Sequence, residues 1–210
     1  MLALIQRESL INSTGMKLAA KYIKNTLLSL NREIDYYDLY SCFPIAVQMF
    51  CDSLELNQSS PLTITGGMSF AGGPLNHYVL SSTTQLINKL RESSNKIGLI
   101  TGVSGLMTKQ SYALWSDKYF DNFSFVDVTS KAKEFDKPLS LSNKNCGTAI
   151  IVGYTILFDE NKNKKAVIYA ELNDKKRLIL NSKNQEAIES MENIEWVGKK
   201  IKFRNGSLVY

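Results

Sequence analysis

The fold of this chain is decided at residues 63–81, which read T-I-T-G-G-M-S-F-A-G-G-P-L-N-H-Y-V-L-S. The stretch begins with β-branched residues, continues through two glycine pairs and then reaches Pro74. Glycine lets the backbone turn tightly and lets a second backbone or a ligand approach closely. Proline suits the first position of a helix, because its missing N–H needs no partner there. The stretch therefore predicts a short strand, a glycine-rich turn and a helix that begins at Pro74.

The residues after Pro74 support this helix. Apolar and β-branched side chains recur at helical spacing at Val79, Leu80, Thr83, Leu86, Ile87 and Leu90. The free N–H groups at the start of such a helix point towards whatever lies over the glycines. Several protein families hold a thioester or a phosphate at a turn of this kind, but a plain packing turn has the same sequence features. Both interpretations stay open at this point.

The rest of residues 1–115 alternates predicted helices and strands. Helices are expected from Thr14 to about Leu30 and at residues 43–54, and strands at 34–40 and 97–101. Tight turns are expected at residues 40–44, 72–74 and 101–105. Strands that alternate with helices indicate the α/β class with a largely parallel sheet. Ligands of such sheets gather at the carboxyl ends of the strands, so the three turns form the candidate site.

The pattern changes after residue 115. Residues 116–145 lack clear periodicity and are predicted to form a linker. Residues 146–210 contain several short β-rich runs and one helical pattern at 185–191. This combination predicts a small open β-barrel, similar in outline to the oligonucleotide/oligosaccharide-binding (OB) fold. The predicted domains are therefore 1–115 and 146–210, joined by 116–145.

Composition narrows the classes of function. The net charge of +5 is mild and scattered along the chain, so nucleic acid is the less favoured partner. No apolar run approaches the roughly 20 residues that span a bilayer, and the first residues lack a signal-peptide pattern. We therefore expect a cytoplasmic protein without a membrane partner. A single histidine and three cysteines without metal-type spacing predict no metal site and free thiols.

Three motifs resemble the thiolase superfamily. They are Y-D-L-Y-S-C-F-P-I-A-V-Q at residues 37–48, G-G-M-S-F-A-G-G-P-L-N-H-Y at 66–78 and G-L-I-T-G-V-S-G-L-M-T-K at 98–109. In this order they are similar to the C-terminal half of acetyl-CoA acetyltransferases, and in particular to thiolase-like proteins with an additional C-terminal β-barrel domain. The resemblance covers roughly residues 10–115, and the barrel region agrees more loosely. It implies a layered α/β/α half followed by an OB-like domain.

The resemblance also implies a site for acetyl-CoA or another acyl-CoA, with no further cofactor, in an acyltransferase of lipid metabolism. Thiolases use a nucleophilic cysteine from the N-terminal half of the fold, a histidine of a Gly-His-Pro turn that activates it, and a second cysteine as acid and base. An Asn or His of the first motif helps to hold an oxyanion-binding water. The matching CoA-binding positions of this chain are Gly72, Gly73, Pro74, Asn76, Gly102, Ser104 and Gly105.

This sequence departs from the thiolase pattern at each catalytic position. Gly73 stands at the place of the activating histidine, Tyr40 at that of the Asn or His, and Gly102 at that of the second cysteine. His77 follows Gly73 by about one helical turn, which makes it the candidate substitute base. Cys42 matches a cysteine of one thiolase branch that is not the nucleophile there, and we expect it to be a core residue first. The candidate catalytic residues are thus His77, Tyr40 and Cys42.

The half of a thiolase that carries the nucleophile has no counterpart in this sequence. We therefore expect a C-terminal, thiolase-like fragment that is inactive alone. It either pairs with a separately encoded N-terminal half or with a second copy, or it is a truncated relic. The alternative is a non-catalytic module for acyl-CoA binding or assembly, because the histidine and the second cysteine are lost together. A nucleic-acid contact through the barrel is the third and least favoured hypothesis.

Overall fold

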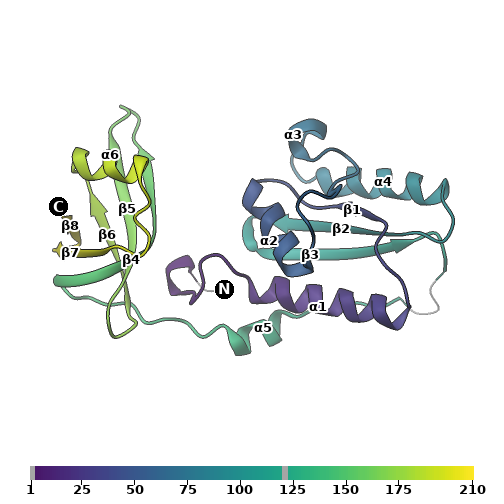
Figure 1. Ribbon diagram of the computed structural model, residues 1–210, viewed down its shortest axis with the longest axis horizontal. Helices are drawn as coiled ribbons and strands as arrows, with labels where there is room; N and C mark the ends of the chain where they lie inside the picture. Colours follow the sequence, from purple (N-terminus) through teal and green to yellow (C-terminus); the bar gives the residue numbers. More distant parts are fainter. Residues whose placement is uncertain (1–2, 120–122) are drawn as a thin grey trace. The chain divides into compact units, whose positions relative to one another are not determined.

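The computed structural model describes residues 3–119 and 123–210, which fall into two compact units (Figure 1). One unit is Ile11–Phe135, and the other combines the described residues of Met1–Leu10 with Asp136–Tyr210. The chain therefore passes between the units twice. Helices and strands are mixed along the chain, which agrees with the expected α/β class.

The sheet of the Ile11–Phe135 unit contains β1 (Tyr36–Asp38), β2 (Ile97–Ser104) and β3 (Leu106–Ser116) in this order. Strands β1 and β2 are parallel, whereas β2 and β3 are antiparallel. The expectation of a largely parallel sheet is therefore wrong. The reason lies at Gly105, whose φ of +56° suits a tight turn that leads β2 directly into β3. Residues 101–104, expected in a turn, belong to β2.

The helices of this unit are α1 (Thr14–Ser29), α2 (Pro44–Leu54), α3 (Met68–Ala71), α4 (Tyr78–Arg91) and α5 (Thr129–Phe135). The expected positions of α1 and α2 are confirmed. Ser13 caps α1 by accepting the N–H of Met16 at 3.3 Å, and Pro44 occupies the first turn of α2. Helix α5 lies within the region expected to be a linker and packs against α1.

Two expectations for residues 63–81 are wrong. Residues 63–65 do not form a strand, because the N–H groups of Ile64 and Thr65 donate to the side-chain carboxylate of Asp38 and not to a neighbouring strand. The helix begins at Tyr78 and not at Pro74. The N–H of His77 donates to the carbonyl of Pro74, and Leu75 has a φ of +47°, which is incompatible with an α-helix.

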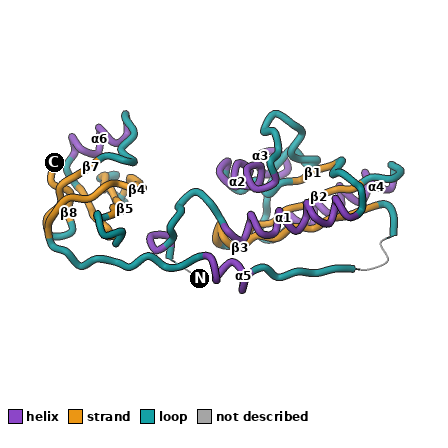
Figure 2. Tube along the Cα trace, turned by 60° about the horizontal axis from the view of Figure 1, so that its bottom comes forward, coloured by secondary structure: helices purple, strands orange, loops and turns teal. Residues whose placement is uncertain are grey.

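Helices cover both faces of the sheet (Figures 1 and 2). Ile97 and Leu99 of β2 face α1 and α2, whereas Ile100 faces α4 and contacts Leu86 and Leu90. Alternate residues of a strand point to opposite faces, which explains this division. A Cβ atom on Gly98 would lie only 2.2 Å from Leu86 Cδ1, so glycine is what lets α4 approach β2 closely.

The second unit is a closed barrel in the order β4-β5-β6-β8-β7. Its elements are the 3₁₀ helix η1 (Leu4–Gln6), β4 (Cys146–Phe158), β5 (Lys164–Glu171), β6 (Arg177–Ser182), α6 (Gln185–Asn193), β7 (Lys200–Arg204) and β8 (Ser207–Val209). The barrel was expected to be open. It closes because β4 is 13 residues long and pairs with both β5 and β7, with a register shift between Ile151 and Gly153.

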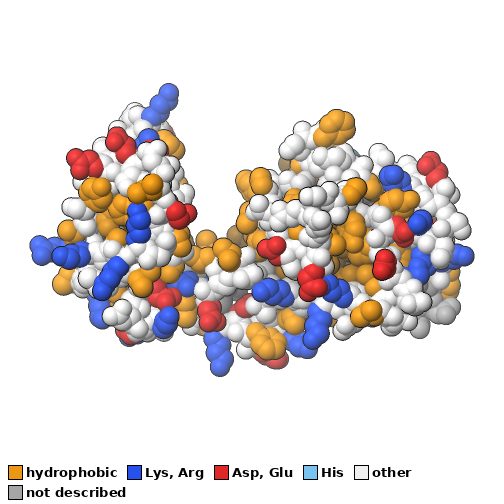
Figure 3. All heavy atoms as spheres, in the orientation of Figure 1, with side chains coloured by type: hydrophobic (Ala, Val, Ile, Leu, Met, Phe, Trp, Pro, Cys, Tyr) orange, Lys and Arg blue, Asp and Glu red, His pale blue; other side chains and the backbone are white. Residues whose placement is uncertain are grey.

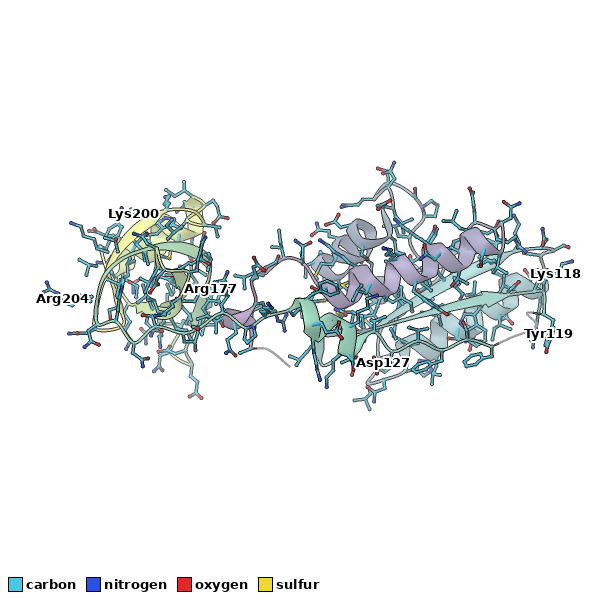
Figure 4. All side chains as sticks on the ribbon, turned by 90° about the horizontal axis from the view of Figure 1, so that it is seen from below. Lys118, Tyr119, Asp127, Arg177, Lys200 and Arg204 are labelled. Carbon is cyan, nitrogen blue, oxygen red and sulfur yellow. The ribbon has the colours of Figure 1, made fainter. Side chains whose placement is uncertain are left out.

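Residues 4–10, expected in the first domain, instead belong with the barrel. Arg177 of β6 is only 3% exposed, and its Nη1 donates to the carbonyls of Ile5 and Arg7. Its Nη2 donates to the carbonyl of Glu8 at 2.9 Å, and its Nε pairs with Glu171. Figure 4 labels this arginine. The sequence gives little sign of the arrangement, because the acceptors on residues 4–10 are backbone carbonyls.

Replacement of Arg177 by alanine should destabilise the barrel by about 2–4 kcal/mol, because it leaves Glu171 and three carbonyls without their buried donor. Unfolding of each unit can be followed separately, since Trp115 belongs to one unit and Trp196 to the other. The measurement is denaturant unfolding followed by Trp196 fluorescence in a Trp115→Phe background.

Lys175→Ala is the matched control. Lys175 also pairs with Glu171, at 3.1 Å, but its side chain is 78% exposed, so its loss should cost less than about 1 kcal/mol. Equal losses for the two variants would contradict the anchoring role of Arg177.

Candidate functional site

The candidate site is built around the buried carboxylate of Asp38, the last residue of β1. Asp38 is 1% exposed. Its Oδ2 accepts the N–H groups of Ile64 and Thr65 at 3.0 and 2.9 Å and the Thr65 hydroxyl at 2.8 Å. Its Oδ1 accepts the hydroxyls of Tyr78 at 2.9 Å and Ser82 at 2.8 Å. The carboxylate thus ties the glycine-rich loop and α4 to the end of β1.

This network joins the first two motifs of the sequence. Tyr78 is the last residue of the second motif, and its ring meets that of Tyr40 from the first motif edge to face, at 5.5 Å between centroids. The Met68 N–H donates to Ser41 Oγ at 2.9 Å. Gly67, with a φ of +80°, passes so close that a Cβ there would lie 3.0 Å from the same oxygen. The second glycine of the first pair is therefore needed for the approach of the two loops.

The third motif reaches the same place from β2. The hydroxyl of Thr101 accepts the N–H of Tyr40 at 2.8 Å. A Cβ on Gly102 would meet Val79 of α4 at 3.4 Å and Ser111 Oγ at 2.7 Å. Consequently Tyr40 and Gly102, two of the expected site residues, both lie beside the first turn of α4.

The remaining expected residues are less enclosed. His77 is exposed, directly precedes α4, and its Nδ1 lies 2.8 Å from Ser81 Oγ on the same helix. Cys42 is half-buried between β1 and α2. The others are exposed, either in the loop between α3 and α4 or at the turn between β2 and β3: Gly72, Gly73, Pro74, Asn76, Ser104 and Gly105. Their roles in binding or catalysis stay predictions.

Both tyrosines of the cluster keep their phenol protons at neutral pH. Burial, followed by the proximity of Cys42, raises the pKa of Tyr40. Burial is also the main reason that the pKa of Tyr78 is raised, and the Asp38 carboxylate adds to it, although hydrogen bonds with Thr65 and Ser41 act in the opposite direction. A raised phenol pKa keeps the proton on the oxygen at neutral pH. Tyr40 therefore has the chemistry of a donor, not of a base.

The sequence did not point to Asp38, Thr65, Tyr78 and Ser82 as site residues. The spacing of Tyr78 and Ser82, four residues apart, places both hydroxyls on one face of α4. An aspartate at the end of an apolar strand is a second signal, because a buried carboxylate requires several donors. In the described residues, no group of three or more His, Cys, Asp or Glu side chains could hold a metal ion. Among the helices described, none is long and apolar enough to cross a membrane.

Asp38→Asn should destabilise the Ile11–Phe135 unit by about 3–5 kcal/mol, because an amide leaves buried donors without an acceptor. Tyr78→Phe removes a single hydroxyl and should cost about 1–2 kcal/mol. Denaturant unfolding followed by Trp115 fluorescence, with Trp196 replaced by phenylalanine, measures both changes.

Gln85→Ala, at an exposed position of the same helix, serves as the control and should stay within about 0.5 kcal/mol of the parent protein. If Asp38→Asn costs no more than Tyr78→Phe, the charge of the carboxylate is not what holds the loop to the helix.

Comparisons with known proteins identify the fold of the chain but not its activity or its ligand. No family model matches the sequence, and no curated protein matches it either. Among solved structures, the chain is similar to a monomeric SCP2-thiolase-like protein, type 1, from Mycobacterium smegmatis, with a TM-score of 0.85 and 24% sequence identity. The likeness covers 100% of this chain but 48% of the other, so this chain spans about half the length of that protein. The fold of the present chain is therefore thiolase-like.

Proposed function

We propose that this chain provides the acyl-CoA-binding part of a thiolase-like acyltransferase and works together with a separate N-terminal half. The observation that carries the proposal is the meeting of the three motifs where the end of β1 lies beside Thr101 and Gly102 of β2, next to the start of α4, within a thiolase-like fold. In α/β sheets such strand ends are where ligands bind. The proposal includes the layered α/β/α arrangement and the OB-like character of the barrel.

In this proposal acetyl-CoA or a longer acyl-CoA is the substrate, and no cofactor takes part. The loop residues Gly72, Gly73, Pro74 and Asn76 approach the thioester, and Gly102, Ser104 and Gly105 line the other side. His77 acts as base for the partner's nucleophile, since its imidazole is exposed and stands at the start of α4. Transfer of the acyl group from one CoA thioester to a second one, with release of the first CoA thiol, requires that nucleophile, so the chain is inactive by itself.

An exposed apolar surface supports the expected partner. Phe70 is 86% and Leu75 is 96% exposed, and Phe43, Ile45 and Leu80 are exposed as well. These five residues, which we call the α2–α4 apolar surface, lie in or next to α2, α3 and α4. Figure 3 shows hydrophobic atoms at the surface around α2 and α3. Exposed apolar patches of this kind mark interaction sites, and a second copy of the chain is the alternative occupant.

Phe70→Asp together with Leu75→Asp should abolish association with a thiolase-type N-terminal half, because two charges would be buried without partners. Analytical ultracentrifugation of the chain with a recombinant N-terminal half measures this. Phe125→Asp, at a residue that is 80% exposed outside this surface, should leave association unchanged. Self-association that the double variant abolishes would assign the surface to a homodimer instead.

Calorimetry with acetyl-CoA tests the function itself. The chain should bind acetyl-CoA alone but turn it over only with the N-terminal half, and His77→Ala should then lower kcat by about 10²- to 10⁴-fold. Lys89→Ala, on the same helix but away from its start, should change neither property.

The second candidate, a non-catalytic acyl-CoA-binding or assembly module in the cytoplasm, is favoured by one observation. The Asp38 carboxylate is already saturated by hydrogen bonds and the Tyr40 phenol remains protonated, so neither group is available as a base. Acetyl-CoA binding without turnover in the presence of the N-terminal half would select this candidate. Absence of acetyl-CoA binding under all these conditions would exclude both.

A further inference from the structure

His77 and Ser81 are joined by two hydrogen bonds at the start of α4. The N–H of Ser81 donates to the His77 carbonyl at 3.1 Å, and the Nδ1 atom of His77 lies 2.8 Å from Ser81 Oγ. The N–H of His77 in turn donates to the carbonyl of Pro74 at 3.0 Å. The backbone of His77 is therefore fixed on both sides, and its ring is held at one nitrogen, although the residue is exposed.

The hydroxyl of Ser81 differs in its partner from the three hydroxyls that follow it on α4. Thr83 and Thr84 donate to the carbonyls four residues before them, at 2.8 and 2.9 Å, which is a common bond of a hydroxyl within a helix. The Ser82 hydroxyl donates to Asp38. The Ser81 hydroxyl instead meets the imidazole ring, so it is placed to act on the chemistry of that ring.

The position of this hydrogen bond matters for the two ring nitrogens. A neutral imidazole has one nitrogen that donates and one that accepts, and the hydrogen bonds of the ring decide which is which. At His77 the partner lies at Nδ1, and within the described residues no hydrogen bond reaches Nε2. If the Ser81 oxygen accepts the Nδ1 proton, Nε2 keeps its lone pair, and a general base needs such a lone pair towards the reactants.

We propose that Ser81 positions His77 for acid–base catalysis: its hydroxyl oxygen accepts the Nδ1 proton, and Nε2 takes the proton of the nucleophile. This inference rests on the proposed function, in which His77 is the base for a nucleophile of the N-terminal half. The nucleophile bonds to the acyl carbon of the thioester as its proton moves to Nε2. The C–S bond then breaks, and the CoA thiolate leaves with that proton, so the ring is neutral again. In between, the Nδ1 proton stays in its hydrogen bond with Ser81, which stabilises the imidazolium.

A nucleophilic role for Ser81 itself fits the geometry less well. A serine nucleophile works with a base that a third group orients through its second nitrogen, and among the described residues no such group bonds to Nε2 of His77. The opposite polarity of the bond, with the Ser81 hydroxyl donating to Nδ1, leaves the proton on Nε2 and removes the base from the site. Ser81 therefore acts through His77 and does not react with the thioester.

Nuclear magnetic resonance of the full chain without a histidine tag tests the position of the proton. His77 is the single histidine of the chain, so a proton–nitrogen correlation spectrum of the isotope-labelled protein reports on its ring alone. At a pH where the ring is neutral, the proton should lie mainly on Nδ1. Ser81→Ala should move it towards Nε2, and Ser81→Thr should restore it. Thr84→Ala, which removes a hydroxyl bonded to the helix backbone, is the matched control and should leave the ring signals unchanged.

Turnover of acetyl-CoA together with the recombinant N-terminal half tests the consequence for catalysis. Ser81→Ala should lower kcat by about 10-fold, a part of the roughly 10²- to 10⁴-fold that a positioned base contributes, and should leave KM unchanged. In a His77→Ala background the same change should lower kcat no further, because Ser81 acts through the ring. Ser81→Thr should recover kcat, and Thr84→Ala should not alter it.

A proton on Nε2 in the parent chain, or ring signals that Ser81→Ala does not change, would overturn the inference. So would an equal loss of kcat from Ser81→Ala with and without His77, or an acetyl group on Ser81 after incubation with acetyl-CoA, detected by mass spectrometry. Absence of turnover, or turnover that His77→Ala does not affect, would refute the proposed function and the catalytic use of the pair, whereas the spectrum still decides where the proton lies. Unfolding followed by Trp115 fluorescence shows that each variant is folded.

Discussion

A single buried charge organises the unit that holds the candidate site. The Asp38 carboxylate lies out of contact with water and accepts hydrogen bonds from four residues, which come from the glycine-rich loop and from α4. Burial of a carboxylate without such partners is strongly unfavourable. The hydrogen bonds to Asp38 therefore fix the positions of the loop and of α4. The path of the loop, the late start of α4 and the meeting of Tyr40 with Tyr78 all follow from this requirement.

The elements that could be predicted from the sequence are those that local features determine. Helices α1 and α2 were predicted because their caps and apolar periodicity are local features. The prediction that the helix begins at Pro74 was wrong, because Leu75 adopts a positive φ and the helix starts only where the Tyr78 hydroxyl can reach Asp38. The closure of the barrel and the attachment of residues 4–10 to Arg177 depend on partners far away in the sequence, which local patterns do not encode. Of the candidate site, Tyr40 and Gly102 were placed together by motif order, but the network beneath them was not foreseen.

The fold and the chemistry of the site lead to different conclusions. The fold is thiolase-like along the whole chain. Gly73, the protonated Tyr40 and Gly102 stand at the three positions where the resemblance expects catalytic side chains. The hydrogen bonds of Asp38 with Tyr78 and Ser82 are buried, and they hold the glycine-rich loop and α4 in place. A shared fold does not by itself carry a shared function, which depends on the residues of the site.

The division of the barrel between the two ends of the chain has a consequence for its biosynthesis. Residues 4–10 are synthesised well before Arg177, the arginine that holds them. The Ile11–Phe135 unit is complete in between and can form its core while the rest is still being made. Residues 4–10 therefore cannot reach their place on the barrel until β6 has been made, and the barrel is completed after the Ile11–Phe135 unit.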